Sequence, residues 1–225
     1  MKAEDFVEFY SRLSFKEREL ARALLARKGV DFAALPITTR PHDVHRPELS
    51  FSQQRLWFLD RLGGGGSSYN IALALRLVGQ LDVAALGRTL NDVVQRHEVL
   101  RSRFELAGDV PLQVIDAPPQ LGLPLSDLSQ LPQPQRDEQA TRLAQHEAAT
   151  TFDLATGPLL RARLVRMAQA EHLVLFTLHH IVSDGWSAGV LFNEVAALYA
   201  AHVQGRPPPL PPLQIQYADY AHWQR

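Results

Sequence analysis

The side chains best suited to proton transfer at neutral pH occur together in one short stretch, residues 179–185, which reads His-His-Ile-Val-Ser-Asp-Gly. Imidazole has the ordinary pKa closest to neutral pH, so histidine is the commonest general acid or base in enzymes. An aspartate follows the second histidine by four residues, and a glycine follows the aspartate. This spacing predicts a proton-handling site.

An apolar run, residues 173–178, precedes the histidines and predicts a β-strand that ends where they begin. Both faces of this strand would be apolar, which indicates a central, buried strand. Successive side chains of a strand point to opposite faces, so we expect different roles for His179 and His180. The alternative is that both are ordinary core histidines. Adjacent histidines on a strand are poor joint ligands, and no His-Glu-x-x-His pair accompanies them, so no metal site is predicted.

A second pattern overlaps the first, because residues 185–189 read Gly-Trp-Ser-Ala-Gly and match the nucleophile elbow of serine hydrolases. In that interpretation Ser187 is the nucleophile. A hydrolase of this kind needs its acid and histidine on later core strands, and the candidates that follow Ser187 are Asp219, His202 and His222. Ser187 is better explained as the N-cap of a helix, and the hydrolase is the less favoured alternative.

Length and composition narrow the class of protein. With 225 residues, of which 46% are hydrophobic, the chain can form one large or two small domains. With a net charge of -1 and a pI near 6.8, the chain lacks the excess positive charge that favours binding to nucleic acid or an anionic membrane. The absence of cysteine excludes disulfides, thiol catalysis and cysteine zinc sites. We expect a cytoplasmic protein without a signal peptide or membrane span.

The chain divides into three regions by composition. Residues 1–35 predict a helical leader, with a capping-box pattern at Ser14 and a helix that continues to about Lys28. Residues 36–49 carry three prolines and predict a linker. Residues 50–225 form the main domain. The alternative for the leader is that its helix is an integral part of the core.

The main domain alternates helical and strand patterns. In chain order we expect a helix from Ser50 to Gly63, a strand over residues 71–77, a helix capped by Asp82, a strand over 100–106, a helix near 135–150, and a hairpin of strands 160–165 and 173–178. The second to fourth of these elements would form a strand-helix-strand unit.

Four stretches, in order, resemble the motifs of the condensation domains of nonribosomal peptide synthetases, relatives of chloramphenicol acetyltransferase. They are residues 52–59 (Ser-Gln-Gln-Arg-Leu-Trp-Phe-Leu), 96–104 (Arg-His-Glu-Val-Leu-Arg-Ser-Arg-Phe), 179–187, and 217–223 (Tyr-Ala-Asp-Tyr-Ala-His-Trp). The resemblance covers residues 50–225. It implies an α/β fold, an α+β sandwich of the chloramphenicol acetyltransferase type, in which helices flank a mixed sheet.

The resemblance also implies a reaction, the formation of an amide bond. An aminoacyl amine attacks a donor acyl or peptidyl thioester, and each group is held on the phosphopantetheine arm of a carrier protein. Donor and acceptor carrier proteins are therefore the expected partners, and the domain itself needs no bound cofactor. His180 is the implied catalytic residue, either as a base or by orienting the amine and stabilising the charged intermediate. Gly185 would let the backbone approach the reacting centre, and its N–H would polarise an oxyanion.

Other residues of the motifs are expected to be structural. His179 would pack beside the catalytic histidine. Asp184 would be a buried carboxylate at the turn, and a buried carboxylate needs a cationic partner. Arg96 is the first candidate for that partner and Arg101 the second.

The resemblance covers only one lobe of a family whose members have two lobes around a cleft. We therefore expect an N-terminal lobe that is inactive alone. The sequence Ser-Asp-Gly-Trp-Ser, residues 183–187, favours a domain that joins an L-configured donor to an L-configured acceptor. The leader would dock to an upstream synthetase subunit, and an adenylation domain would follow in the parent protein. Two alternatives remain, a non-catalytic recruitment platform and a coenzyme A-dependent acyltransferase.

Overall fold

The computed structural model describes residues 9–10, 13, 15–29, 37–41, 44 and 46–225. Parts of the expected leader and linker therefore lie outside the described residues, and so does Ser14, the expected cap of the leader helix. The leader helix itself is present as α2 (Phe15–Arg27).

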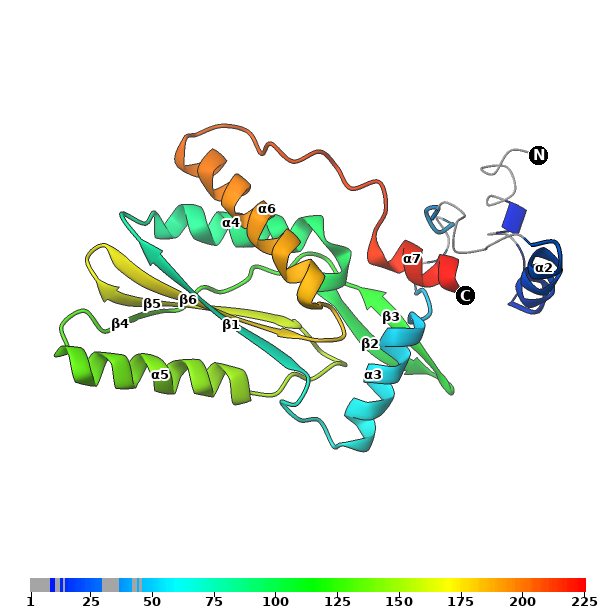
Figure 1. Cartoon of the computed structure of the whole chain (residues 1–225), viewed down its shortest axis with the longest axis horizontal. Helices are drawn as coiled ribbons and strands as arrows, with labels where there is room; N and C mark the ends of the chain where they lie inside the picture. Colours follow the sequence, from blue (N-terminus) through cyan, green and yellow to red (C-terminus); the bar gives the residue numbers. More distant parts are fainter. Residues whose placement is uncertain (1–8, 11–12, 14, 30–36, 42–43, 45) are drawn as a thin grey trace.

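The main domain contains helices and strands in mixed order (Figure 1). After α2 they are α3 (Phe51–Leu62), β1 (Asn70–Val78), α4 (Val83–Arg96), the short 3-10 helix η2 (Glu98–Arg101), β2 (Ser102–Ala107), β3 (Val110–Ile115), β4 (Leu125–Asp127), α5 (Gln133–Ala149), β5 (Leu160–Ala168), β6 (Glu171–His179), α6 (Gly185–Val203) and α7 (Tyr217–Gln224).

Four strands form one mixed sheet in the order β1-β6-β5-β4. β6 is antiparallel to both β1 and β5, whereas β5 and β4 run parallel. Helix α5 covers one face of this sheet, and α4 and α6 lie together on the other face (Figure 1). The prediction of a mixed sheet flanked by helices is confirmed, and β6, which precedes the histidine pair, is an interior strand as expected.

The two faces of β6 belong to two separate hydrophobic clusters. Val174, Phe176 and Leu178 join the larger cluster, which α4 and α6 cover. Leu175 joins the smaller cluster on the α5 side, with Val165 of β5. The alternation along the strand therefore places every second side chain against a different helical layer.

Two helix starts follow their capping residues as predicted. The Ser50 side chain accepts a hydrogen bond from the Gln53 backbone N–H, and the Gln53 side chain accepts one from the Ser50 N–H, a complete capping box. Asp82 caps α4 by accepting from the Ala85 N–H at 2.9 Å. Short polar side chains at these positions satisfy N–H groups that the first helical turn leaves without a partner.

The region after α4 differs from the prediction. The expected strand over 100–106 begins as the 3-10 turn η2, and β2 pairs with β3 in a separate two-stranded sheet. The strand-helix-strand unit therefore joins two different sheets. β3 and β4 were not predicted, because Pro111 interrupts the pattern of the first and the second has only three residues.

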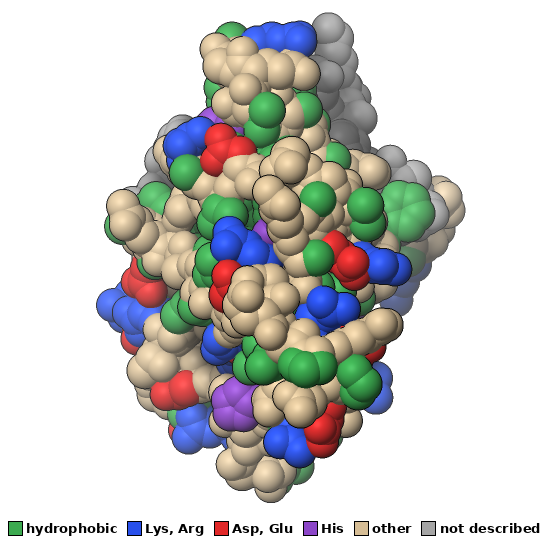
Figure 2. Space-filling model, turned by 90° about the vertical axis from the view of Figure 1, so that its left-hand side faces the viewer, with side chains coloured by type: hydrophobic (Ala, Val, Ile, Leu, Met, Phe, Trp, Pro, Cys, Tyr) green, Lys and Arg blue, Asp and Glu red, His purple; other side chains and the backbone are tan. Residues whose placement is uncertain are grey.

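The surface carries both signs of charge. Basic and acidic side chains are intermingled over the face shown in Figure 2, in keeping with the near-zero net charge of the chain. Within the part of the chain that the structure describes, no helix has the length and apolar character needed to cross a bilayer.

Candidate functional site

His180 lies one residue beyond the end of β6, on a turn where its side chain is exposed. Its backbone N–H donates to the Tyr69 carbonyl at 2.8 Å, and its ring Nδ1 lies 2.7 Å from the Ser183 carbonyl oxygen. A carbonyl oxygen can only accept, so Nδ1 carries the proton of the neutral ring. Nε2 therefore keeps its lone pair, and the turn presents a basic nitrogen to solvent.

His179 has the opposite environment, with no exposed surface. Its Nδ1 accepts a hydrogen bond from the Ile181 backbone N–H at 3.1 Å. The ring packs against Tyr69 and Phe152, with ring centroids 6.2 Å apart in both pairs. Burial, helped by the neighbouring charge of His180, lowers the pKa of His179 to about 4. His179 is therefore neutral at pH 7 and accepts from the backbone of the turn.

Asp184 caps helix α6. Its carboxylate accepts from the Ser187 backbone N–H at 2.8 Å, and the Ser187 hydroxyl accepts from the Asp184 N–H at 2.7 Å. The hydrogen bond from the Ser187 backbone is the main cause of a lowered Asp184 pKa. Two expectations are corrected here. Asp184 is an exposed cap and not a buried carboxylate, and Ser187 is the third residue of α6 and not its N-cap.

Gly185 is the first residue of α6, where the helix supplies no acceptor for its N–H. A side-chain carbon at this position would meet nothing within 4 Å. Packing within the described residues therefore does not require a glycine. Gly185 is exposed, so a group that approaches the turn from outside can reach its backbone.

The arginines expected to hold Asp184 have other partners. Arg96 pairs through Nε with Glu194 at 3.1 Å, and its Nη1 donates to the Pro211 carbonyl at 2.6 Å. Arg101 donates to the Asp116 carbonyl. The predicted pairing is therefore wrong, because Asp184 satisfies its charge with helix N–H groups instead.

Glu194 was missed in the sequence. It is buried on α6 and also lies 2.6 Å from Nε2 of His97. The signal was present, because Glu194 is the only acidic or basic residue, histidine aside, in the 19-residue helix α6. A lone acid in an apolar helix needs a cationic partner when it is buried.

The hydrolase alternative is not supported by the histidines that follow Ser187. Nε2 of His202 lies 2.7 Å from a carboxylate oxygen of Asp92 on α4. His222 contacts Arg18 of α2. Both downstream histidines are therefore engaged elsewhere, and the Ser187 hydroxyl takes part in the capping box.

The first motif contacts the histidine turn directly. Gln53 of α3 is buried, and its Nε2 donates to the Ile181 carbonyl at 3.4 Å. Ser50, which caps the same helix, lies 3.0 Å from the Tyr217 hydroxyl of α7. Burial raises the pKa of Tyr217, so the phenol stays protonated. The first, third and fourth motifs therefore meet at one end of the sheet.

The second motif joins the fourth through Arg40, in the expected linker. Its guanidinium pairs with Glu98 and with Asp219, both at 2.9 Å. Gln216 adds a second connection, because its side chain accepts from the Glu98 N–H and donates to the Arg96 carbonyl. Sequence reasoning missed Arg40, since only the folded chain brings its partners together.

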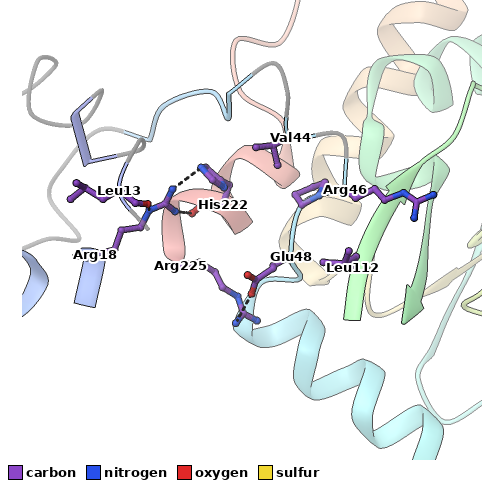
Figure 3. Close-up of a pocket in the computed structure, with 9 residues that line it drawn as sticks. Leu13, Arg18, Val44, Arg46, Glu48, Leu112, His222 and Arg225 are labelled. Atoms are coloured by element: carbon purple, nitrogen blue, oxygen red, sulfur yellow. Dashed lines mark hydrogen bonds and ion pairs between the residues drawn. The ribbon is translucent and has the colours of Figure 1, made fainter. Parts of the chain in front are cut away.

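Two hollows lie apart from the histidine turn. One, with a volume of about 300 Å³, lies between the N-terminal segment and α7; Figure 3 shows Arg18 reaching toward His222 at its edge, with Glu48 beside Arg225. Arg18 donates to the His222 carbonyl at 3.2 Å, which fastens α2 to α7. The other, about 450 Å³, lies under the proline-rich segment 207–212. Neither hollow has His180 in its lining.

The chain is similar to known synthetases. It is 48% identical over 209 residues to a linear gramicidin synthase of Brevibacillus parabrevis, a match that covers 92% of this chain and 4% of that protein. It is 40% identical over 205 residues to the phosphinothricin tripeptide synthetase PhsB of Streptomyces viridochromogenes, covering 91% of this chain and 17% of that one.

Solved structures show the same fold. The X-domain from teicoplanin biosynthesis superposes with a TM-score of 0.72 at 36% identity, over 84% of this chain and 39% of that chain. The first condensation domain of the CDA synthetase superposes with a TM-score of 0.68 at 28% identity, over 73% of this chain and 42% of that chain. The chain spans a small part of the synthetases and about two fifths of the solved domains.

The family match covers the whole of the main domain. Residues 45–225 match the condensation domain family, a range that begins five residues before the expected boundary at Ser50. The four motifs that carried the resemblance lie inside this range and meet around one end of the mixed sheet. With its chloramphenicol acetyltransferase-like lobe, the chain belongs to the condensation domains of nonribosomal peptide synthetases.

Proposed function

We propose that this chain is the N-terminal lobe of a condensation domain that forms a peptide bond between two carrier-bound substrates. The observation that carries the proposal is the histidine turn, where Nδ1 of His180 is held by the Ser183 carbonyl and Nε2 remains exposed as an acceptor. The acceptor substrate is an aminoacyl thioester, and the donor is an acyl or peptidyl thioester. We assign His180 as the catalytic residue.

The reaction needs little acid-base catalysis from the protein. The amine nitrogen attacks the thioester carbonyl carbon, a C–N bond forms, the C–S bond breaks, and the nitrogen loses a proton as the thiol leaves. Nε2 of His180 accepts a hydrogen bond or a proton from that nitrogen. The Gly185 N–H, at the positive end of α6, donates to the developing oxyanion. Positioning supplies much of the rate, because a thiolate is already a good leaving group.

The partners follow from the two substrates. Donor and acceptor carrier proteins present their phosphopantetheine arms to the turn, and the domain binds no cofactor of its own. Residues 1–35 form a docking segment for an upstream subunit, residues 36–49 a connection, and residues 50–225 the lobe. In the parent protein, which acts in the cytoplasm, an adenylation domain follows. The sequence Ser-Asp-Gly-Trp-Ser supports an L-configured donor and an L-configured acceptor.

The test uses the lobe alone and joined to a C-terminal lobe. Each form is mixed with donor and acceptor carrier proteins loaded with L-aminoacyl groups, and the dipeptidyl carrier is measured by mass spectrometry. We expect product only from the two-lobed form. Product from the single lobe would overturn its inactivity, and equal rates with D- and L-donors would overturn the subtype. Acyl transfer from coenzyme A thioesters in place of carriers would indicate a coenzyme A-dependent acyltransferase.

A second candidate is a recruitment platform without catalysis. One solved relative, 35% identical with a TM-score of 0.72, is the X-domain in complex with OxyB from teicoplanin biosynthesis. The arrangement of His180 favours the catalytic role, because a platform does not need a histidine whose tautomer is fixed and whose basic nitrogen is exposed. A two-lobed form that binds carriers without condensing their substrates would favour the platform.

A further inference from the structure

A series of contacts connects the C-terminal end of α5 to the histidine turn. We infer that Arg161, on β5, is a positioning residue for His180. The inference rests on the proposed role of His180, and it assigns a function to a side chain outside the motifs that carried the resemblance.

Arg161 makes two kinds of contact at once. Its guanidinium carbon lies 3.8 Å from the centroid of the Phe152 ring. Its terminal nitrogens donate to the carbonyls of Glu147, Thr150 and Thr151 at 3.2, 2.6 and 3.2 Å. These carbonyls lie at or just beyond the end of α5, where the helix leaves carbonyls unsatisfied and the dipole is negative. Only a planar, forked cation can stack on a ring and reach several carbonyls together.

The stacked ring transmits this constraint to the buried histidine. Phe152 is buried, and its ring meets that of His179 edge to face, with an angle of 86° between the planes. Contacts with both a planar cation and an imidazole leave the Phe152 ring little freedom to turn. Asn70, which pairs with His179 across the sheet, holds the same end of α5 by donating to the Ala148 and Thr150 carbonyls at 2.8 Å.

The buried histidine sets the backbone on both sides of the catalytic one. Its Nδ1 accepts from the Ile181 N–H, and its carbonyl accepts from the Val182 N–H at 3.0 Å. His180 lies between these two anchors. A displacement of Phe152 would therefore turn His179, shift the Ile181 hydrogen bond and move the imidazole of His180 away from the Ser183 carbonyl.

A purely structural role for Arg161 can be separated from positioning, because the same strand carries a matched arginine. Arg163 lies two residues further on the same face, and both side chains are 25% exposed. Both pair with Glu147, Arg161 at 3.6 Å and Arg163 at 2.6 Å. Arg163 otherwise contacts the Ser126 hydroxyl. It therefore fastens α5 to the sheet without stacking on Phe152.

The first experiment measures the imidazoles directly by 15N NMR in this chain, comparing Arg161→Lys with Arg163→Lys. Lysine keeps the charge of each arginine and loses the planar fork. We expect Arg161→Lys to raise the pKa of His179 toward its ordinary value and to lower the population of the Nδ1–H tautomer of His180. Arg163→Lys should leave both unchanged. Equal changes in the two variants, or no change in either, would overturn the inference.

The second experiment measures condensation by the two-lobed form. Arg161→Lys should lower kcat on the order of tenfold and leave KM for both carriers unchanged, because misplacement of a catalytic group costs rate more than binding. Arg163→Lys should keep the kcat of the unaltered protein. A parallel rise in KM, or an equal loss in the control, would contradict positioning.

Phe152→Leu provides a second route if Arg161→Lys fails to fold. It keeps an apolar side chain and removes the ring between Arg161 and His179. We expect the same loss of kcat, and no further loss in the double variant, because the two side chains act through one contact. Additive losses would overturn the inference. The NMR result does not depend on activity, so a failure of the proposed function remains distinguishable from a failure of this inference.

Discussion

His179 and His180 are neighbours in the chain, yet they belong to two regions with different physical properties. The closed side contains His179 and Phe152, both buried, and its hydrogen bonds go to backbone groups. The open side contains His180, Asp184 and Gly185, all exposed at the start of α6. The closed side contributes packing energy and fixed geometry, whereas the open side presents the basic nitrogen and the backbone N–H of the proposed reaction. The same residue type therefore lies in two different environments, which supports the different roles proposed for the two histidines.

The largest expected effect is on the open side and concerns activity alone. His180→Ala in the two-lobed form should lower condensation by about 10²–10⁴-fold, the usual contribution of a general acid or base. The thermal midpoint of this chain should stay near its original value, because an exposed side chain contributes little to stability. A rate within a few-fold of the unaltered domain would contradict a catalytic role for the exposed histidine.

The next effect is on the closed side and concerns stability. Burial holds the pKa of His179 at about 4 in the folded chain, below its ordinary value of 6.5. The unfolded chain therefore binds the extra proton first as pH falls. The contribution of His179 to the free energy of unfolding is therefore complete above pH 6.5. It falls by roughly 3 kcal/mol as the pH approaches 4. Urea denaturation across this range should show a flatter pH dependence for His179→Asn.

His180→Asn is the control for that measurement, because it removes the exposed histidine and keeps the buried one. Its stability should retain most of the pH dependence of the unaltered chain, because burial is the larger cause of the lowered His179 pKa and the charge of His180 the smaller one. His172, whose pKa burial also lowers, is present in all three proteins and cancels in the comparison. An unchanged slope in His179→Asn would show that the closed side does not hold a neutral imidazole.

A smaller effect is expected at Gly185, whose N–H is the proposed donor to the oxyanion. Gly185→Ala should leave stability unchanged or raise it by about 0.5–1 kcal/mol, because its side chain would meet no atom within 4 Å. Turnover in the two-lobed form should fall on the order of tenfold if a reacting carbonyl approaches the N–H closely. Unchanged turnover would show that this N–H lies outside the reaction path.

The smallest effect is the loss of a helix cap on the open side. Asp184→Ala should lower the free energy of unfolding by about 1 kcal/mol, measured by urea denaturation. Asp82→Ala removes the equivalent cap of α4 and should cost about the same. Only the Asp184 variant should also lower turnover, because α6 begins beside the histidine turn. Equal turnover in the two variants would show that the Asp184 cap does not contribute to the catalytic site.

Local patterns predicted the elements around the site well. The caps at Ser50 and Asp82 and the hairpin that ends in His179 depend on residues close in sequence, where propensity and hydrogen bonding decide the structure. The pairing of β2 with β3 was missed because Pro111 weakens the strand pattern.

Long-range ionic contacts could not be predicted in the same way. Arg96 and Glu194 are 98 residues apart in the chain and meet only because α4 and α6 pack together. The expected partner, Asp184, belongs to the third motif, but its position before a helix gave it backbone donors. The motifs singled out residues that gather around the histidine turn, and the fold decided which of them touch.

The hydrogen bond between the His180 ring and the Ser183 carbonyl limits the route by which a proton can leave the imidazole. With Nδ1 committed to a backbone oxygen, the ring has one working nitrogen and no second one through which to pass a proton onward. In the proposed reaction, a proton that Nε2 takes from the amine must leave again from Nε2, toward the departing thiolate. The leaving group would then regenerate the base in each cycle, and the site would reset without help from bulk water.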